Sequence, residues 1–530
     1  MKRLLSVWLV LCLLLGLAVP ALAENETASC PMIYLEGQGI WLYRDDGTQV
    51  YNLGIDLMGR VQPNLKELVK RSFHGDYTGD YGPFSELLYE TVVPVYETEA
   101  LGKDGMPTDG SHVHPNDMWR GQGTLSNIKT TIPLSNGGSY PVYRWHFDWR
   151  LSPITLAEEL RDLIDAVLAD TGAEQVDLIS RCESTNIVYA YLYTYGGEKV
   201  HSSTFYSSST NGIGAANALF SGELTIDPNA LERFLDYYRD SNNLVIRDEQ
   251  TTDLIFLLLA LANEMKLVGV GLDRFMRTFN AFKKDALVPI LRATFATFPG
   301  YWSMVSPEYY EKARAFVFGG VEDEYAGLLE KTDAYYEMQK HINEKLRALK
   351  DDVRFAVIAK YGYQAFPLSA DANEESDGYV SVGYASYGAT TADFDKTLSD
   401  SYIRQAVKNG NGRYLSADCK IDASTALFPD TTWFTKDLYH THFPDCVNDL
   451  CVAFANNDNM TVFTDPAYPQ FLQYTATNSA GSDDATGTLT PIRSIEDTHD
   501  NTAGEKRTFW TGLRDFFRAL GAFLKTLFRR

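Results

Sequence analysis

Short apolar runs alternate with longer helical stripes in the first part of the chain. Strand-like runs begin at residues 31, 140, 175 and 200, in the segments PMIYLEG, YPVYRWHFDW, QVDLIS and VHSSTFY. An apolar stripe with three-and-four spacing separates the second run from the third and predicts a helix. This order favours parallel strands joined by crossover helices. We therefore expect an α/β fold with a mostly parallel sheet flanked by helices.

The helix predicted between these strands has signals at both ends. Ser152 is suited to cap its N-terminus, Pro153 fits its first turn, and Gly172 can end it. Its buried stripe consists of Leu156, Leu160, Leu163, Ile164, Val167 and Leu168.

The middle of the chain is different, because residues 211–350 are helical in pattern almost throughout. Strand patterns resume at 353, in VRFAVIAKYGY, and at 431, in TTWFTKDLYH. We expect a core split into 24–210 and 351–474, with 211–350 inserted as a large helical cap. Residues 475–505 are rich in Ser, Thr, Gly and Asp, lack periodicity, and are predicted to be a flexible linker.

The first 23 residues have a basic start, an apolar stretch and a small-residue ending, which is typical of a secretory signal peptide. Cleavage after Ala23 is expected, and an uncleaved amino-terminal anchor is the alternative. The apolar segment 254–262 is too short to span a bilayer and is predicted to be a buried helix. The mature protein is thus expected to be secreted or extracytoplasmic. With 530 residues and 13% aromatic residues, the chain fits an ordered α/β enzyme domain that carries an insertion.

The net charge of −23 disfavours nucleic acid as a partner. The basic residues gather in 506–530, where seven of them accompany one acidic residue. Apolar residues in this tail recur at helical spacing and form one stripe: Phe509, Leu513, Phe516, Leu520, Phe523 and Leu527. The pattern predicts a basic amphipathic helix that associates with a membrane surface, or one that docks on its own acidic domain.

The segment SRCES, at 180–184, lies between a predicted strand and a helix-like pattern. It resembles the nucleophile elbow G-x-S-x-G, in which a strand ends in a sharp turn and a helix begins at once. Cys182 occupies the nucleophile position, and serines replace both glycines. Five of the six cysteines remain after processing, and an odd count in an exported chain leaves one thiol free. Cys182 is the natural candidate.

The segments YRWHFDWRLSP and TGAEQVDLIS, followed by the elbow, resemble the lecithin:cholesterol acyltransferase-like lipases of the α/β-hydrolase fold. Asp148, Trp149 and Arg150 carry the most specific match. Weaker matches are the LEGQG loop, SDGYVSVGYASYGAT from Ser376 and DLYHTHFPD from Asp437. The resemblance spans roughly 31–457, and the elbow with its cysteine departs from the family pattern.

This resemblance implies an α/β-hydrolase fold and a triad of Cys182, Asp377 and His440, in the chain order that this fold requires. Asp377 would orient the imidazole, and His440 would activate the thiol and later protonate the leaving group. Backbone N–H groups of Gln38 and Glu183 would form the oxyanion hole. The resemblance further implies ester or lipid substrates.

Each assignment has an alternative. Cys182 could be an inert small residue, Asp377 could only shape a turn, and His442 competes with His440, which we favour because it ends the strand pattern. His112 and His114 have strand spacing, but loop histidines without further ligands are usually solvated, so no metal and no cofactor are predicted. The sequence favours a secreted hydrolase or acyltransferase, and the alternative is a catalytically inactive hydrolase-fold protein that binds a surface or ligand.

Overall fold

The computed structural model describes residues 30–498, except for 38–41, 45, 49–54, 98, 109, 114–123, 226, 228–229, 231–232, 234–271 and 478–485. The predicted signal peptide 1–23, the predicted buried helix at 254–262 and the basic tail 506–530 lie outside the described residues. Gln38 and His114 also lie outside them.

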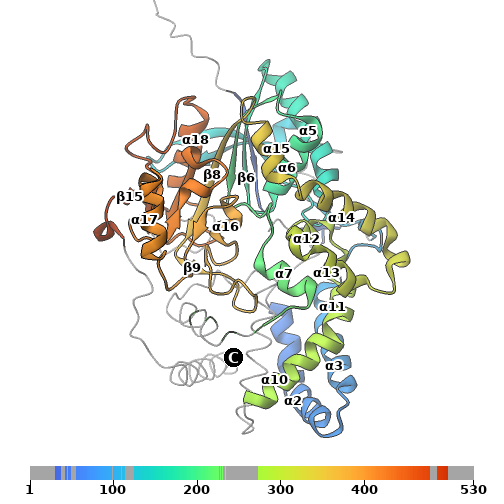
Figure 1. Ribbon diagram of the computed structural model, residues 1–530. Helices are drawn as coiled ribbons and strands as arrows, with labels where there is room; N and C mark the ends of the chain where they lie inside the picture. The colour runs from blue at the N-terminus through green and yellow to red at the C-terminus, as the bar shows by residue number, and fades with distance from the viewer. Residues whose placement is uncertain are drawn as a thin grey trace, which may run out of the picture.

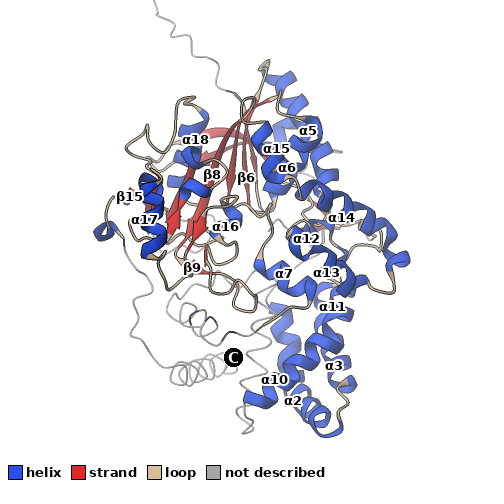
Figure 2. Cartoon of the chain, in the orientation of Figure 1, coloured by secondary structure: helices blue, strands red, loops and turns tan. Residues whose placement is uncertain are grey.

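A nine-stranded sheet forms the centre of the molecule (Figure 2). Its interior neighbours pair in parallel, whereas the pairs at the two edges are antiparallel. The predicted α/β fold with a mostly parallel sheet flanked by helices is thereby confirmed. Across the sheet the strands are β15 (Gly487–Pro491), β14 (Phe471–Ala476), β13 (Thr432–Lys436), β8 (Arg354–Tyr361), β7 (Val200–Tyr206), β6 (Val176–Arg181), β1 (Met32–Leu35), β5 (Ser139–Trp145) and β4 (Lys129–Pro133).

Helices cover both faces of the sheet because the side chains of each strand alternate between two apolar cores. One core joins the sheet to α5 (Pro153–Thr171), α6 (Ser184–Tyr195) and α15 (Ile342–Ala348), and contains Ile33, Leu178 and Val357. The other joins it to α18 (Asp445–Ala455) and contains Met32, Ile179 and Ile358. In Figure 1 the first group and α18 lie on opposite sides of the strands.

Helix α5 forms where the sequence predicts it. Ser152 caps its N-terminus by accepting a hydrogen bond from the Ile154 N–H at 3.3 Å. Gly172 ends it in the left-handed conformation, with a φ of 74°. The predicted stripe packs inward on the sheet, and Leu168 at its margin is only partly buried.

The described residues between β7 and β8 are mainly helical. They form α7 (Gly214–Ser221), α10 (Leu272–Ala281), α11 (Leu287–Ala293), α12 (Pro299–Trp302), α13 (Pro307–Phe318) and α14 (Ala326–Gln339), ahead of α15. Two earlier helices, α2 (Ile55–Thr78) and α3 (Gly82–Tyr96), share an apolar core with this group and lie beside α10 and α11 in Figure 1. Residues 55–96 fall in the segment 24–210, which the sequence predicts to be the first part of the core. Helical periodicity alone does not indicate which element a helix packs against.

Strand β15 lies inside the segment 475–505 that was predicted as a linker. It pairs antiparallel with β14, so that Gly487 sits opposite Ala476. A Cβ atom on Gly487 would lie 2.2 Å from the Tyr474 ring, which shows how closely the two strands pack there. A short edge strand with exposed threonines carries little apolar periodicity, so the residue pattern does not predict it.

None of the helices in the described parts of the chain is both long enough and apolar enough to cross a membrane.

Candidate functional site

Cys182 lies at the turn between β6 and α6, at the carboxyl end of the parallel strands. Its φ of 48° is in the left-handed region, where a non-glycine residue costs about 1–3 kcal/mol. Its N–H donates to the Tyr206 carbonyl at 2.9 Å, which fixes the turn against β7. The fold thus holds the Cys182 side chain in a strained position at the end of the strand, with part of its surface exposed.

The two serines that replace the glycines of the elbow pattern are buried and hydrogen-bonded. The Ser184 hydroxyl accepts from the Arg181 N–H at 2.8 Å and lies 3.1 Å from the Leu35 carbonyl. The Ser180 hydroxyl donates to the Thr204 carbonyl at 3.2 Å. Because both hydroxyls find backbone partners, the close packing of the turn accommodates side chains larger than glycine.

His440 joins Cys182 and Asp377 into one hydrogen-bonded chain. Its Nε2 atom lies 3.2 Å from the Cys182 Sγ atom, and its Nδ1 atom lies 2.7 Å from the Asp377 Oδ2 atom. The three residues follow different strands, since Cys182 follows β6, Asp377 follows the short strand β10 (Glu375–Ser376) and His440 follows β13. The structure therefore brings together the three residues that the sequence pattern singled out.

The Asp377 carboxylate is fixed in place by the turn that carries it. Its Oδ1 atom accepts hydrogen bonds from the N–H groups of Tyr379 at 3.0 Å and Val380 at 2.7 Å. Gly378 has a φ of 101°, and a Cβ atom there would lie 2.2 Å from the Tyr439 ring. The Asp-Gly pair thus shapes a turn and also directs one carboxylate oxygen at His440. Since an ionised carboxylate only accepts, the Nδ1 atom of His440 carries a proton.

The charges of the triad stabilise one another. Burial opposes the charged imidazole, but the Asp377 carboxylate and the Cys182 sulfur outweigh it and hold the pKa of His440 well above its usual value. Burial likewise opposes the charged carboxylate, yet the His440 ring and the Lys360 ammonium hold the pKa of Asp377 below its usual value. This arrangement favours an imidazolium beside the sulfur, which is the environment that stabilises a thiolate.

His442, the competing histidine, occupies a different position. Burial, followed by the nearby charge of Lys360, lowers the pKa of His442 to about 4, so its ring is neutral near pH 7. Its carbonyl accepts a hydrogen bond from the Tyr206 hydroxyl at 3.2 Å. The hydrogen-bonded position beside Cys182 belongs to His440.

Lys360 is a part of this region that the sequence analysis missed. It lies in β8 with no exposed surface, and its Nζ atom donates to the carbonyls of Tyr439 at 3.1 Å, His440 at 2.8 Å and His442 at 2.9 Å. Burial lowers the pKa of Lys360 to about 7, whereas the three carbonyls favour its charged form. The sequence feature that could have pointed to Lys360 is a lysine within the apolar run RFAVIAKY, which forms a strand.

The expected oxyanion donors are placed in part. Glu183 precedes the first residue of α6, so its N–H belongs to the helix start, where amide groups lack intrahelical partners. Gln38 lies outside the described residues, but the preceding Gly37 packs on the elbow, where an added Cβ atom would lie 3.3 Å from the Cys182 Cβ atom. Glu36 pairs with Arg144 at 3.1 Å and with Arg181 at 3.6 Å, which ties this loop to the turn.

The Glu183 side chain is buried beneath α12. Burial, with smaller contributions from Cys182 and Asp148, raises the pKa of Glu183 well above its usual value. An added Cβ atom on Gly300 would lie 2.6 Å from the Glu183 Oε1 atom and 2.0 Å from the Trp149 carbonyl oxygen. The helical region thus approaches the turn closely.

The segment Asp148, Trp149 and Arg150 is buried, and its first and last residues form an ion pair. Arg150 has no exposed surface and binds the Asp148 carboxylate through Nε at 2.9 Å and Nη2 at 2.7 Å. It also donates to the Glu99 carbonyl at 2.9 Å and the Ser111 hydroxyl at 3.0 Å. These contacts connect the end of β5 to the loop before β3 (His112–Val113). In the described part of the chain, the segment therefore has a structural role.

The remaining candidates have the following positions. The cysteines in the described part of the chain, Cys182 included, are free thiols: Cys30, Cys182, Cys419, Cys446 and Cys451. His112 lies in β3, with its Nδ1 atom 2.8 Å from the Gly110 carbonyl.

Comparisons with known proteins add little to this description. No family model and no curated protein matches the sequence. A chain in the crystal structure of the Tle4-Tli4 complex matches over 63% of this chain and 75% of that chain, with 11% sequence identity and a TM-score of 0.24.

Proposed function

We propose that this protein is an α/β hydrolase that cleaves esters, or transfers their acyl groups, through Cys182, His440 and Asp377. The main support is the continuous chain of contacts from the Cys182 sulfur through the His440 ring to the Asp377 carboxylate. The sulfur lies 3.2 Å from the Nε2 atom of the ring, and the carboxylate lies 2.7 Å from its Nδ1 atom. Nucleophile, base and orienting acid in this order are the constellation that acyl transfer requires.

In the proposed reaction, the Cys182 thiolate attacks the ester carbonyl carbon and forms a C–S bond. The electron pair of the carbonyl moves onto its oxygen, which the N–H of Glu183, together with that of Gln38, stabilises. Collapse of this intermediate breaks the bond to the leaving alcohol, which takes a proton from the Nε2 atom of His440. Water or a second alcohol then attacks the thioester carbonyl carbon while the neutral His440 ring takes its proton. The C–S bond breaks, the acid or the new ester leaves, and the Cys182 thiolate beside the protonated His440 is restored.

Two further features support a hydrolase fold with a cap. Cys182 sits on a strained turn between a parallel strand and a helix, as the nucleophile elbow requires. The helical region reaches this turn at Gly300, so it is placed to cover a substrate. By resemblance to the lecithin:cholesterol acyltransferase-like lipases, the substrates are esters or lipids. The predicted signal peptide supports an extracytoplasmic location, and the predicted basic tail supports association with a membrane surface.

The alternative, a binding protein that has lost catalysis, is weakened by the same geometry. A carboxylate that accepts one imidazole N–H and two backbone N–H groups is oriented far more than a surface turn needs. The fully paired serines of the elbow also indicate that the turn is intact.

The test measures hydrolysis of a short p-nitrophenyl ester and, by intact-mass spectrometry, the trapped acyl-enzyme. The wild type should turn over the ester and gain one acyl mass, and Cys182→Ala should do neither. Cys419→Ala is the matched control, because Cys419 is also a free, partly exposed thiol with a positive φ, of 57°. Activity in Cys182→Ala, or acylation that follows Cys419, would exclude this proposal.

A further inference from the structure

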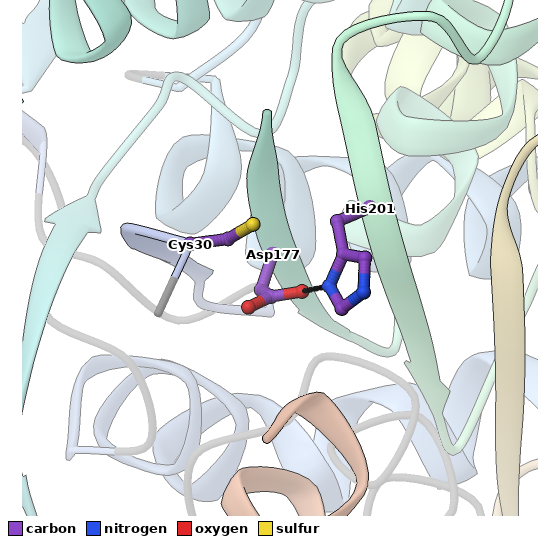
Figure 3. A group of neighbouring side chains, drawn as sticks. All are labelled: Cys30, Asp177 and His201. Carbon is purple, nitrogen blue, oxygen red and sulfur yellow. Dashed lines mark hydrogen bonds and ion pairs between the residues drawn. The ribbon is translucent and has the colours of Figure 1, made fainter. Parts of the chain in front are cut away.

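A second group of cysteine, histidine and aspartate lies at the opposite end of β6. Cys30 precedes β1, Asp177 is the second residue of β6, and His201 is in β7 (Figure 3). Each offers one ligand atom, and these atoms lie within 4.8 Å of one another. From the rise of about 3.3 Å per strand residue, this group lies about 16 Å from Cys182, so it takes no part in acyl transfer.

The orientation of His201 is suited to a metal ligand. Its Nδ1 atom lies 2.8 Å from the Asp177 Oδ1 atom, toward the side where Figure 3 places Cys30. Its Nε2 atom lies 3.0 Å from the Asp458 Oδ1 atom. A carboxylate on the outer nitrogen is the usual outer-shell partner of a metal-bound histidine, because it fixes the ring and its tautomer.

Asp177 is oriented in the same manner. Its side chain is almost completely buried, and its Oδ1 atom accepts the Ser202 hydroxyl at 2.5 Å. Asp458 is 71% exposed and also pairs with Arg354 at 3.2 Å, so it fits an outer-shell role rather than that of a ligand. The candidate ligands are thus one thiol, one imidazole and one carboxylate.

We propose that Cys30, Asp177 and His201 bind a Zn²⁺ ion through Sγ, a carboxylate oxygen and Nδ1, with Asp458 as the outer-shell partner of His201. Zinc accepts sulfur, nitrogen and oxygen ligands at about 2.0–2.3 Å in a tetrahedron, so the ligand atoms need to lie about 3.3–3.7 Å apart. The present spacings require adjustments on the order of 1 Å. His201 is 23% exposed, which leaves room for water as the fourth ligand. The ion would tie the segment before β1 to β6 and β7.

The test uses the full chain, loaded with Zn²⁺ and dialysed, with bound zinc measured by elemental analysis. The wild type should retain one zinc ion per chain, and Cys30→Ser and His201→Gln should retain none. Co²⁺ replaces zinc as a spectroscopic probe, because a thiolate ligand gives a near-ultraviolet charge-transfer band. Asp458→Asn should weaken zinc binding by about tenfold or more.

Cys182→Ala is the necessary control, because the triad is itself a group of cysteine, histidine and aspartate. The Co²⁺ band should persist in Cys182→Ala and vanish in Cys30→Ser. The opposite pattern, or equal zinc retention by the wild type and Cys30→Ser, would overturn the proposal. Circular dichroism of each metal-free variant verifies folding, and Cys30→Ser suffices for the decision if His201→Gln does not fold.

Discussion

The Lys360 ammonium donates a hydrogen bond to the His440 carbonyl at 2.8 Å from inside the central sheet. It binds two more carbonyls of the same loop, so one buried side chain on β8 anchors the backbone that carries the histidine. These three hydrogen bonds go to backbone carbonyls of the loop rather than to the reacting sulfur, so Lys360 acts as a positioning residue.

Replacing this lysine tests that role. Lys360→Met should lower kcat for ester hydrolysis at least tenfold with little change in KM, because the loop loses three donors while substrate contacts remain. The free energy of unfolding should fall by about 1–3 kcal/mol, since three buried carbonyls lose their partner. Steady-state kinetics and urea denaturation measure both effects. Lys350→Met, on an exposed position, is the control, and equal kinetics of the two variants would exclude a positioning role.

Asp377→Asn should destabilise the protein in a pH-dependent manner. The lowered pKa of Asp377 gives stability that is present above pH 3.8 and is lost as the pH falls through the folded value. The raised pKa of His440 gives stability that is present below pH 6.5 and is lost as the pH rises through the folded value. The stability difference from the wild type should therefore be largest between pH 3.8 and 6.5, at about 3–5 kcal/mol.

Urea denaturation at about pH 3, 5 and 9 measures the stability difference between Asp377→Asn and the wild type below, within and above the range from pH 3.8 to 6.5. A difference that stays constant with pH would show that Asp377 and His440 do not form a charged pair.

Glu183→Gln should change stability little below pH 4.5, because both side chains are then uncharged and glutamine has the same shape. A raised carboxyl pKa gives stability that is present below pH 4.5 and is lost as the pH rises through the folded value. The wild type should therefore lose stability relative to Glu183→Gln at alkaline pH. Thermal unfolding at a series of pH values measures this trend, and parallel curves would contradict it. Glu183→Ala should cost about 1–3 kcal/mol below pH 4.5 through lost packing, and this cost should shrink as the pH rises, because the variant has no carboxyl to ionise.

Cys182→Ser should give a weakened enzyme. An alkoxide is much harder to form than a thiolate, and the charged His440 ring that the raised pKa favours in the resting enzyme cannot accept a proton from a serine hydroxyl. We expect kcat/KM to fall at least about a hundredfold, which corresponds to about 2.7 kcal/mol. Ester hydrolysis by purified proteins measures the change. A serine variant as active as the wild type would show that the site is not adapted to a thiolate.

Arg150→Met should destabilise the protein by about 3–5 kcal/mol, because it leaves the Asp148 carboxylate buried without its partner. Arg161→Met is the matched control, since Arg161 pairs with Asp162 on a surface where such a pair is worth below about 1 kcal/mol. Urea denaturation compares the two variants. Equal losses of unfolding free energy in the two variants would mean that the buried Arg150–Asp148 pair contributes no more to stability than the exposed Arg161–Asp162 pair.

The sequence by itself determined the features that depend on neighbouring residues. The ends of α5 followed from Ser152 and Gly172, because capping groups act within one helical turn. The turn at Cys182 followed from an apolar strand that meets a helical pattern. The α/β class followed from the alternation of the two periodicities.

Tertiary structure decided which distant residues meet. His440 rather than His442 faces Cys182 because the Asp377 turn, which lies far away in the sequence, holds it: the His440 N–H donates to the Asp377 carbonyl at 2.8 Å, and the ring Nδ1 atom lies 2.7 Å from the Asp377 Oδ2 atom. The packing of α2 and α3 with α10 could not be predicted from the residue pattern, because these helices lie far apart in the sequence. The pattern did not predict the pairing of β15 either. Periodicity tells which face of an element is buried but not against what, and the order of strands in the sheet supplies that information.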